Sequence, residues 1–209
     1  MEKTIAALEA LYTELNIPNN PAGDTFRSLG KMIEFSKGEK LPLYRGEEGL
    51  LYILLQGCTC CEAETPDGRA VLECICYRPY EAVNPVGMFT GEASLENCVC
   101  LTDSFFAVFP FSAVTELVQS DMEMMSIYSR CLKDALGEQT RHKYMLSLRS
   151  EEKYEWFLKY YGEVAESIPM RIVAQFLNLD PATLSRVRGK KRGAAKHSVY
   201  KEEKSKNTQ

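Results

Sequence analysis

Apolar and polar positions alternate in two different ways along the chain, and they divide it into a β-rich part and a helical part. Residues 4–15 carry apolar side chains at helical spacing, and Pro18 follows that segment. From residue 25 to 110, short apolar runs are separated by glycine- and proline-containing turns. Short, regularly spaced strands of this kind are typical of a β-sandwich or barrel.

The clearest hairpin joins residues 50–64 to residues 70–77 through a turn at 66–69. This turn contains Asp-Gly, which favours the positive φ that tight hairpin turns need. A hairpin centred there places Cys61 opposite Cys74 and Thr59 opposite Cys76. These residues are predicted to share one core-facing side of the hairpin with Ala63 and Leu72.

A long amphipathic helix is predicted over residues 121–148, which contain no proline. The positions of its expected seam recur at steps of three and four: Met125, Tyr128, Leu132, Ala135, Gln139, His142 and Leu146. A single helix of this length needs a partner surface, and a coiled-coil contact with a second copy would supply one. Packing on the chain's own barrel is the alternative, because Gln139 and His142 weaken the apolar seam.

A further helix is expected at 151–161, and two short helices joined by a tight turn come after it. The first short helix covers 168–177, and Asn178 opens the turn because Asn tolerates the left-handed backbone conformation. Asp180 then caps the second helix, at 181–191, with Pro181 at its first position. The apolar residues expected to lock the two helices together are Val173, Ala174, Leu177, Leu179, Leu184 and Val187.

The second short helix has the side chains that a DNA-reading helix needs on its outer face. Arg186 is suited to reading guanine O6 and N7 through two hydrogen bonds. Hydroxyl groups beside it suit phosphate or base contacts, and basic residues downstream neutralise phosphates. The predicted DNA-binding residues are Thr183, Ser185, Arg186, Arg188, Lys190 and Lys191. The alternative is an ordinary helical hairpin with a solvated basic face.

This order of elements resembles the CRP/FNR family of bacterial transcription regulators, over nearly the whole chain. The most specific match is VAQFLNLDPATLSRV at 173–187, close to the family's I-A-x-x-L-G-x-x-x-E-T-L-S-R-I. The resemblance implies an α+β fold: a double-stranded β-helix of the cyclic-nucleotide-binding type (a β-roll), a long dimerisation helix and a C-terminal, winged helix-turn-helix. It implies an effector-sensing domain at 1–120, a dimerisation helix at 121–148, and a DNA-binding domain with a basic tail at 149–209.

Three departures from the family pattern change what is expected. Ala182 stands where the family has a base-contacting Glu, so the operator is expected to differ from the familiar one. No arginine lies between Arg78 and Arg130 to hold a cyclic-nucleotide phosphate, so cyclic AMP is not the expected effector. Gly91 and Glu92 remain the candidate ligand-binding residues. The polar segment 193–209 is consistent with a disordered basic tail as well as with a wing.

Composition and charge fit a two-part globular protein. The chain has 209 residues, of which 45% are hydrophobic and 26% charged. Residues 1–140 hold 10 Lys and Arg against 21 Asp and Glu, whereas 141–209 hold 15 against 8. The net charges, −11 and +7, point to a basic part that contacts a polyanion. No apolar run is long enough to span a membrane, and no signal-peptide pattern opens the chain, so a cytoplasmic protein without a membrane partner is expected.

The chain contains 8 cysteines, and the first is Cys58, so the N-terminal iron–sulfur ligands of some family members are missing. Reduced thiols are expected in a cytosol. Three Cys-x-Cys pairs, at 58/60, 74/76 and 98/100, lie on predicted strands. Packing as small hydrophobic residues is the main interpretation, and a soft-metal or oxidant sensor is the alternative.

The sequence therefore predicts a homodimeric, sequence-specific transcription regulator without a cofactor or bound metal. The expected partners are double-stranded DNA, a second copy of the chain, RNA polymerase and an unidentified small-molecule effector. The alternatives are a thiol- or metal-responsive regulator that uses the β-roll cysteines, and a β-roll scaffold that has lost specific DNA binding. No enzymatic activity and no catalytic residue is expected, because a cupin-like site would need histidines and residues 1–141 contain none.

Overall fold

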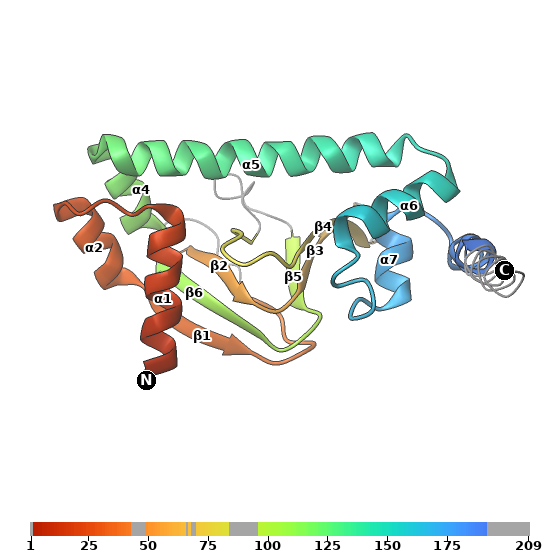
Figure 1. Cartoon of the computed structure of the whole chain (residues 1–209), viewed down its shortest axis with the longest axis horizontal. Coiled ribbons are helices and arrows are strands. Elements are labelled where there is room, and N and C mark those ends of the chain that lie inside the picture. The colour runs from red at the N-terminus through yellow and green to blue at the C-terminus, as the bar shows by residue number, and fades with distance from the viewer. Residues whose placement is uncertain (1, 43–48, 66, 68–69, 84–95, 192–209) are drawn as a thin grey trace, which may run out of the picture. The chain divides into compact units, whose positions relative to one another are not determined.

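A computed structural model of the chain describes residues 2–42, 49–65, 67, 70–83 and 96–191 (Figure 1). The chain divides into two compact units, Met1–Thr140 and Arg141–Gln209. The predicted α+β class is confirmed, with antiparallel sheets in the first unit and a helical second unit. None of the helices in the described part of the chain has the length and apolar character that crossing a membrane requires.

The first unit combines two small antiparallel sheets with helices before and after them. One sheet has the strand order β1-β6-β2 and the other β4-β3-β5. The strands are β1 (Lys31–Phe35), β2 (Leu50–Gln56), β3 (Thr59–Glu64), β4 (Ala70–Cys76), β5 (Glu96–Cys100) and β6 (Ser104–Pro110). The helices are α1 (Glu2–Leu15), α2 (Pro21–Leu29), α4 (Phe111–Ser120) and α5 (Met122–Leu146), of which α5 continues past Thr140 into the second unit.

Strands β2 and β6 of the β1-β6-β2 sheet are buried on both faces, and successive side chains of each strand point to opposite faces. On β2, Leu51 and Ile53 pack with residues of α1, α2 and α4. Tyr52 and Leu54 belong instead to a second core, which they share with cysteines of β3, β4 and β5. This second core lies between the two sheets and forms the interior of the roll.

The β3–β4 hairpin has the predicted register at one end and a different register at the other. Cys61 pairs with Cys74, and Thr59 pairs with Cys76, which confirms the expected alignment. An irregularity between Cys61 and Glu62 then shifts the pairing by one residue, so that Leu72 pairs with Glu62 and not with Ala63. The predicted alignment therefore holds as far as Cys61, and a β-bulge offsets the pairs beyond it, so that Ala63 pairs with Val71. Leu72 is buried, as predicted.

Two cysteines are joined where adjacent strands bring them together. Cys61 on β3 and Cys98 on β5 are register partners, with Cα atoms 4.2 Å apart, and they form a disulfide. The expectation that the thiols are all reduced is wrong for this pair. The pairing depends on the register of strands that are 37 residues apart in sequence, which composition does not reveal.

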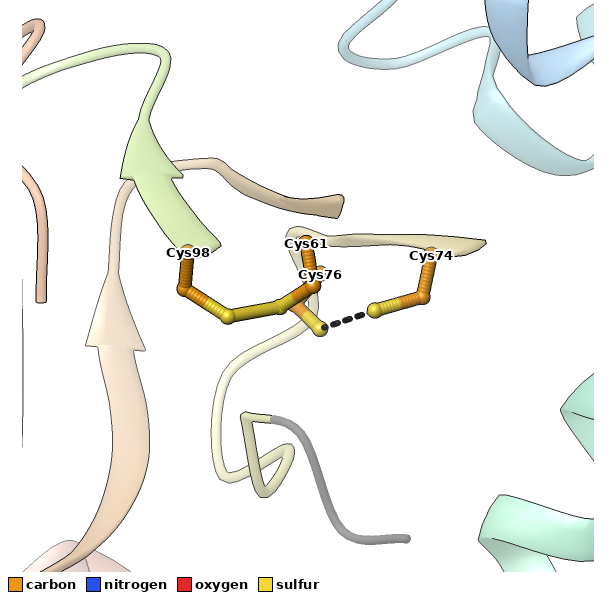
Figure 2. The surroundings of a disulfide bond; sticks show 4 residues. All are labelled: Cys61, Cys74, Cys76 and Cys98. Carbon is orange, nitrogen blue, oxygen red and sulfur yellow. Dashed lines mark hydrogen bonds between the residues drawn. A yellow bond between two sulfur atoms is a disulfide. The ribbon is translucent and has the colours of Figure 1, made fainter. Parts of the chain in front are cut away.

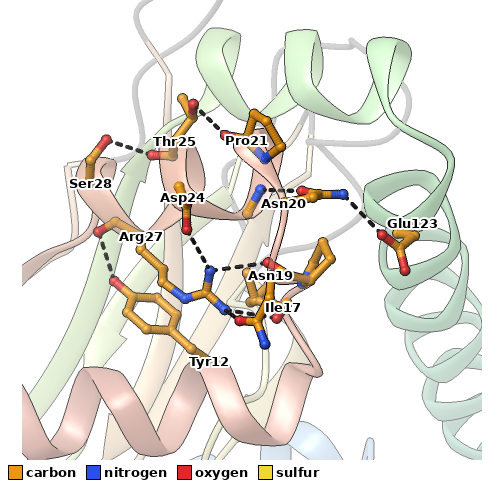
Figure 3. Close-up of polar contacts among 12 residues, drawn as sticks. Tyr12, Ile17, Asn19, Asn20, Pro21, Asp24, Thr25, Arg27, Ser28 and Glu123 are labelled. Carbon is orange, nitrogen blue, oxygen red and sulfur yellow. Dashed lines mark hydrogen bonds and ion pairs between the residues drawn. The ribbon is translucent and has the colours of Figure 1, made fainter.

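The helices that precede the sheets are fixed by a polar cluster around Arg27 (Figure 3). The Arg27 guanidinium donates to the carbonyl oxygens of Ile17 and Pro18, at 2.9 and 3.0 Å. Asn20 caps α2 by accepting from the backbone N–H of Gly23 at 2.9 Å. The Asn20 amide also donates to Glu123 at 2.9 Å, so the same residue links α2 to the beginning of α5.

The predicted long helix is confirmed as α5. Part of the face that was expected to form a dimer seam packs against residues of the same chain. Tyr128 packs against the core of the first unit, and His142 stacks on Phe176 with ring centroids 4.3 Å apart. The apolar side chains that remain most exposed on α5 within the first unit are Met122 and Leu136, at 84% and 60%.

The second unit is built from α6 (Ser150–Tyr161), α7 (Met170–Phe176) and a helix at residues 181–191. Its core is aromatic on one side, where Phe157 and Tyr161 of α6 pack against Phe176 of α7. Leu184 and Val187 from the 181–191 helix are buried and complete this core. The three helices therefore form one compact body around a shared interior.

Candidate nucleic-acid interface

The turn between α7 and the 181–191 helix has the predicted chemistry. Asn178 has φ +48°, in the left-handed region that ends many helices. The backbone N–H groups of Asn178 and Leu179 donate to the carbonyls of Gln175 and Ala174, both at 2.9 Å. These two bonds are those of a Schellman motif, which satisfies the last carbonyls of α7 and reverses the chain.

Asp180 begins the next helix as predicted. Its carboxylate accepts from the backbone N–H of Thr183 at 2.9 Å, which satisfies one of the unpaired donors at a helix start. The hydrogen bonds with Thr183 also hold the pKa of Asp180 below its ordinary value. The predicted helix-turn-helix backbone is therefore present in full.

The 181–191 helix separates its buried and exposed side chains along opposite faces. Leu184 and Val187 lie in the core, as the sequence indicated. The exposed positions are Ala182, Ser185, Arg186, Gly189, Lys190 and Lys191, and Thr183 is half-buried. The exposed set recurs at steps of three and four, so it forms one continuous face of short side chains beside a single arginine.

Arg186 is held against its own helix in this structure. Its Nη2 atom donates to the hydroxyl oxygen of Thr183 at 2.8 Å, one helical turn earlier. Both groups were predicted to contact DNA, and the bond brings them into direct contact with each other. The contact is exposed, so a nucleobase edge can exchange with the Thr183 hydroxyl as the acceptor for Arg186.

The two lysines at the end of the helix are paired with carboxylates of α6. Lys190 Nζ lies 2.7 Å from Glu151, and Lys191 Nζ lies 3.2 Å from Glu155. The hydrogen bond and the positive charge of Lys190 lower the pKa of Glu151. Sequence reasoning missed this acidic pair, although its spacing of four residues on a predicted helix signals a shared face.

Arg188 differs from the other predicted DNA contacts because it turns toward the interior. The residue is half-buried, and its Nε atom is buried without a hydrogen-bond partner in the part of the chain that the structure describes. A guanidinium held this way is less available to phosphates than the exposed lysines.

A buried lysine that the sequence did not single out also contacts the turn after α7. Lys153 on α6 is buried, and its Nζ donates to the carbonyl oxygen of Leu177 at 3.0 Å. Burial lowers the pKa of Lys153. The bond fixes the end of α7, where the carbonyl end of the helix favours a cation.

The remaining predicted sites lie partly beyond what the structure describes. Gly91, Glu92 and the segment 193–209, with its proposed wing, are outside the described residues. Within residues that are described, no group of three or more His, Cys, Asp or Glu side chains is arranged to hold a metal ion.

Solved structures with the same arrangement of elements are numerous, although their sequences differ widely from this one. FixK2 from Bradyrhizobium japonicum matches with a TM-score of 0.66 and 14% identity, over 79% of this chain and 86% of its own. The c-di-GMP-responsive global regulator CLP of Xanthomonas campestris matches with a TM-score of 0.63 and 16% identity, over 83% of this chain and 92% of its own. A transcriptional regulator of the CRP/FNR family from Thermus thermophilus has a TM-score of 0.58 and 18% identity, over 77% and 84%.

The chain has the CRP/FNR fold. In this CRP/FNR fold, the first unit corresponds to the β-roll and the second contains the helix-turn-helix. No protein-family model and no curated protein sequence matches the chain. The similarity to these structures therefore establishes the fold alone. Any proposal about function depends on the side chains of the 181–191 helix.

Proposed function

We propose that this chain is a sequence-specific DNA-binding transcription regulator that works as a homodimer in the cytoplasm. The observation that carries the proposal is the exposed face of the 181–191 helix, which presents Arg186 among short side chains behind an intact helix-turn-helix turn. Such a face can enter a major groove without steric conflict. The +7 charge of residues 141–209 favours the same partner.

The residues divide into one that reads sequence and several that position the helix. Arg186 exchanges its bond with Thr183 for guanine O6 and N7, and the released Thr183 hydroxyl and Ser185 contact phosphates. Lys190 and Lys191 exchange their α6 carboxylates for phosphate oxygens. With Ala182 beside Arg186, no side-chain acceptor is available there for cytosine N4, so the operator differs from that of regulators with a Glu at this position.

Selection from a pool of random duplexes, followed by binding titrations, tests this assignment. The wild-type chain should enrich a two-fold symmetric site. Arg186→Ala should weaken binding to that site by about 1–3 kcal/mol and relax the preference at one base pair in each half-site. Lys190→Ala is the matched control, because loss of a phosphate contact weakens binding to all sequences alike. Failure to enrich any site, or an Arg186→Ala variant with unchanged specificity, would contradict the proposal.

We propose that residues 1–120 sense the effector and that residues 149–209 bind DNA. The dimer is proposed to form through α5. Met122, Met125 and Leu136 are exposed at 84, 38 and 60%, and their positions fit one stripe of a seven-residue repeat. Leu136→Asp should convert the dimer to a monomer in sedimentation equilibrium. Lys133→Asp, at an exposed position off the stripe, is the control that should stay dimeric.

The roll is proposed to sense a small molecule, with Gly91 and Glu92 as candidate contacts and RNA polymerase as the partner on DNA. CLP, described as c-di-GMP-responsive, has a similar fold, which supports an effector for this chain without identifying it. An effector acts only through different affinities for two conformations. Thermal-shift screening of nucleotides and small metabolites tests for one, and a ligand should raise the melting temperature in proportion to its concentration over its Kd.

A further inference from the structure

Cys61 occupies the centre of a row of three cysteines that crosses the second sheet. On one side its register partner is Cys98 on β5, and on the other side it is Cys74 on β4. Antiparallel register partners have Cα atoms about 4.5–5.5 Å apart, within the range that disulfides accept. Cys61 is joined to Cys98 in this structure, but the sheet geometry allows it to join either neighbour (Figure 2).

The three cysteine residues differ in their exposure to solvent. Cys61 and Cys98 are fully buried, and Cys74 is half-buried at the edge strand β4. A small thiol in solution therefore cannot reach the Cys61–Cys98 disulfide directly, whereas it can reach Cys74. Cys74 is therefore the half-buried register partner of one sulfur of a buried disulfide.

Cys76 lies beside Cys74, on the same strand. Their Sγ atoms are 3.9 Å apart, within the range of a sulfur hydrogen bond (Figure 2). The hydrogen bond with Cys74, together with burial, raises the pKa of Cys76 well above its ordinary value. Cys76 therefore stays a thiol, and its sulfur lies within hydrogen-bond distance of the Cys74 sulfur.

We propose that Cys74, Cys61 and Cys98 form a thiol–disulfide exchange site inside the roll. The thiolate of Cys74 attacks Sγ of Cys61, the Cys74–Cys61 bond forms, and the Cys61–Cys98 bond breaks. Cys98 leaves as a thiolate and takes up the proton that Cys74 lost. One disulfide and one thiol are present before and after the step, so no oxidant or reductant is consumed.

The exchange moves the covalent link from the β3–β5 pair to the β3–β4 pair. It also moves one disulfide sulfur to the half-buried position of Cys74, where a small external thiol such as glutathione can attack it. That attack gives a mixed disulfide at Cys74 and a free Cys61 thiol, and a second glutathione resolves the mixed disulfide to oxidised glutathione. The roll interior thereby responds to the thiol concentration outside, and this chemistry does not depend on the proposed DNA binding.

The experiment is disulfide mapping of the full chain equilibrated in glutathione buffer, quenched with acid and alkylated. Cleavage after glutamate separates the three cysteines, because Glu62, Glu73 and Glu96 lie between them in sequence. Wild-type protein should yield both the Cys61–Cys98 and the Cys61–Cys74 crosslinks. Cys98→Ser should yield Cys61–Cys74 alone.

The kinetic arm of the test measures how fast glutathione reduces the disulfide. Cys74→Ser should keep Cys61–Cys98 but slow its reduction by about 10-fold or more, because the exposed relay is lost. Cys131→Ser, which removes a thiol on α5, is the control that should behave as wild type. Cys74→Ala gives the same measurement if the serine variant fails to fold. A single Cys61–Cys98 crosslink in wild type, or reduction of the Cys74 variants at the wild-type rate, would overturn the proposal.

Discussion

Lys190 at the end of the 181–191 helix donates a hydrogen bond to Glu151 at the start of α6, with Nζ and Oε1 2.7 Å apart. Lys191 repeats the arrangement with Glu155, one turn further along α6. Exposed ion pairs of this kind contribute little to stability. Their effect is on the electrostatic surface, because they place two negative charges beside the lysines proposed to bind phosphates.

The double substitution Glu151→Gln and Glu155→Gln should therefore tighten binding to non-specific duplex DNA. In the wild-type chain each lysine has to break its ion pair with a carboxylate before it contacts a phosphate. Because the double variant lacks these ion pairs, we expect it to bind DNA about 3- to 10-fold more tightly at low salt. Fluorescence anisotropy over a series of salt concentrations measures both the affinity and its salt dependence. Glu14→Gln on α1 removes an exposed carboxylate of the other unit and should leave binding unchanged, and equal gains from both variants would contradict the interpretation.

The backbone of the candidate interface was predictable from sequence because its signals are local. Asn178 and Asp180 specify the turn and the helix start within three residues of each other, and the structure has both features. The pairing of Lys190 with Glu151 was not predictable in the same way. The two residues are 39 apart in sequence, and only the packing of α6 against the second short helix brings them together.

Helices α2 and α4 of the first unit were not predicted from the sequence. For α2 a local signal exists, because Asn at the cap and Pro at the first position favour the start of a helix. The structure has both features, since Asn20 caps α2 and Pro21 is its first residue. In the roll, the hairpin register at Cys61 followed from the turn, but the bulge after it had no sequence signal.

Thr59 carries a hydroxyl whose removal should stabilise the roll. The residue is fully buried on the core face of β3, and its Oγ1 has no hydrogen-bond partner among the residues described. Thr59→Val keeps the shape and removes the unsatisfied group, so the free energy of unfolding should rise by about 1 kcal/mol. Chemical denaturation measures the change.

Thr102→Val is the matched comparison for Thr59, with the opposite expected sign. The Thr102 hydroxyl accepts from the backbone N–H of Cys58 at 2.9 Å. Valine would leave that donor unpaired, at a cost of about 1–3 kcal/mol. If both variants lost stability by similar amounts, the Thr59 hydroxyl would have a role that its surroundings do not reveal.

Asn178 should tolerate glycine and resist alanine. Its φ of +48° is open to glycine, whereas a β-carbon without the local hydrogen bonding of Asn is disfavoured there. Asn178→Ala should lower the free energy of unfolding of the second unit by about 1 kcal/mol, and Asn178→Gly should leave it nearly unchanged. Thermal unfolding monitored by tryptophan fluorescence follows this unit, because Trp156 lies in its core. A glycine variant as unstable as the alanine variant would show that the Asn178 side chain, and not the backbone angle, sets the stability of the turn.

Glu81 should make the first unit less stable as the pH rises from about 4.5 to about 7. Burial raises the pKa of Glu81 to about 7, against the opposing effect of Arg78 and with a further increase from Glu138. In this interval the unfolded chain releases the proton while the folded chain keeps it, so the loss of stability begins near the ordinary pKa and is complete above the raised one. The loss amounts to at most about 3 kcal/mol.

Glu81→Gln tests this origin of the pH dependence without removing the contacts of the side chain. The Glu81 carboxyl accepts from the backbone N–H groups of Tyr77 and Arg78, both at 3.3 Å, and the amide oxygen of glutamine can accept the same bonds. The variant should match wild type near pH 4.5 and become the more stable protein above pH 7, as measured by urea denaturation at a series of pH values. Glu34→Gln, at an exposed position on β1, should follow the wild-type profile. A Glu81→Gln profile with the wild-type slope between these pH values would assign the titration to another group.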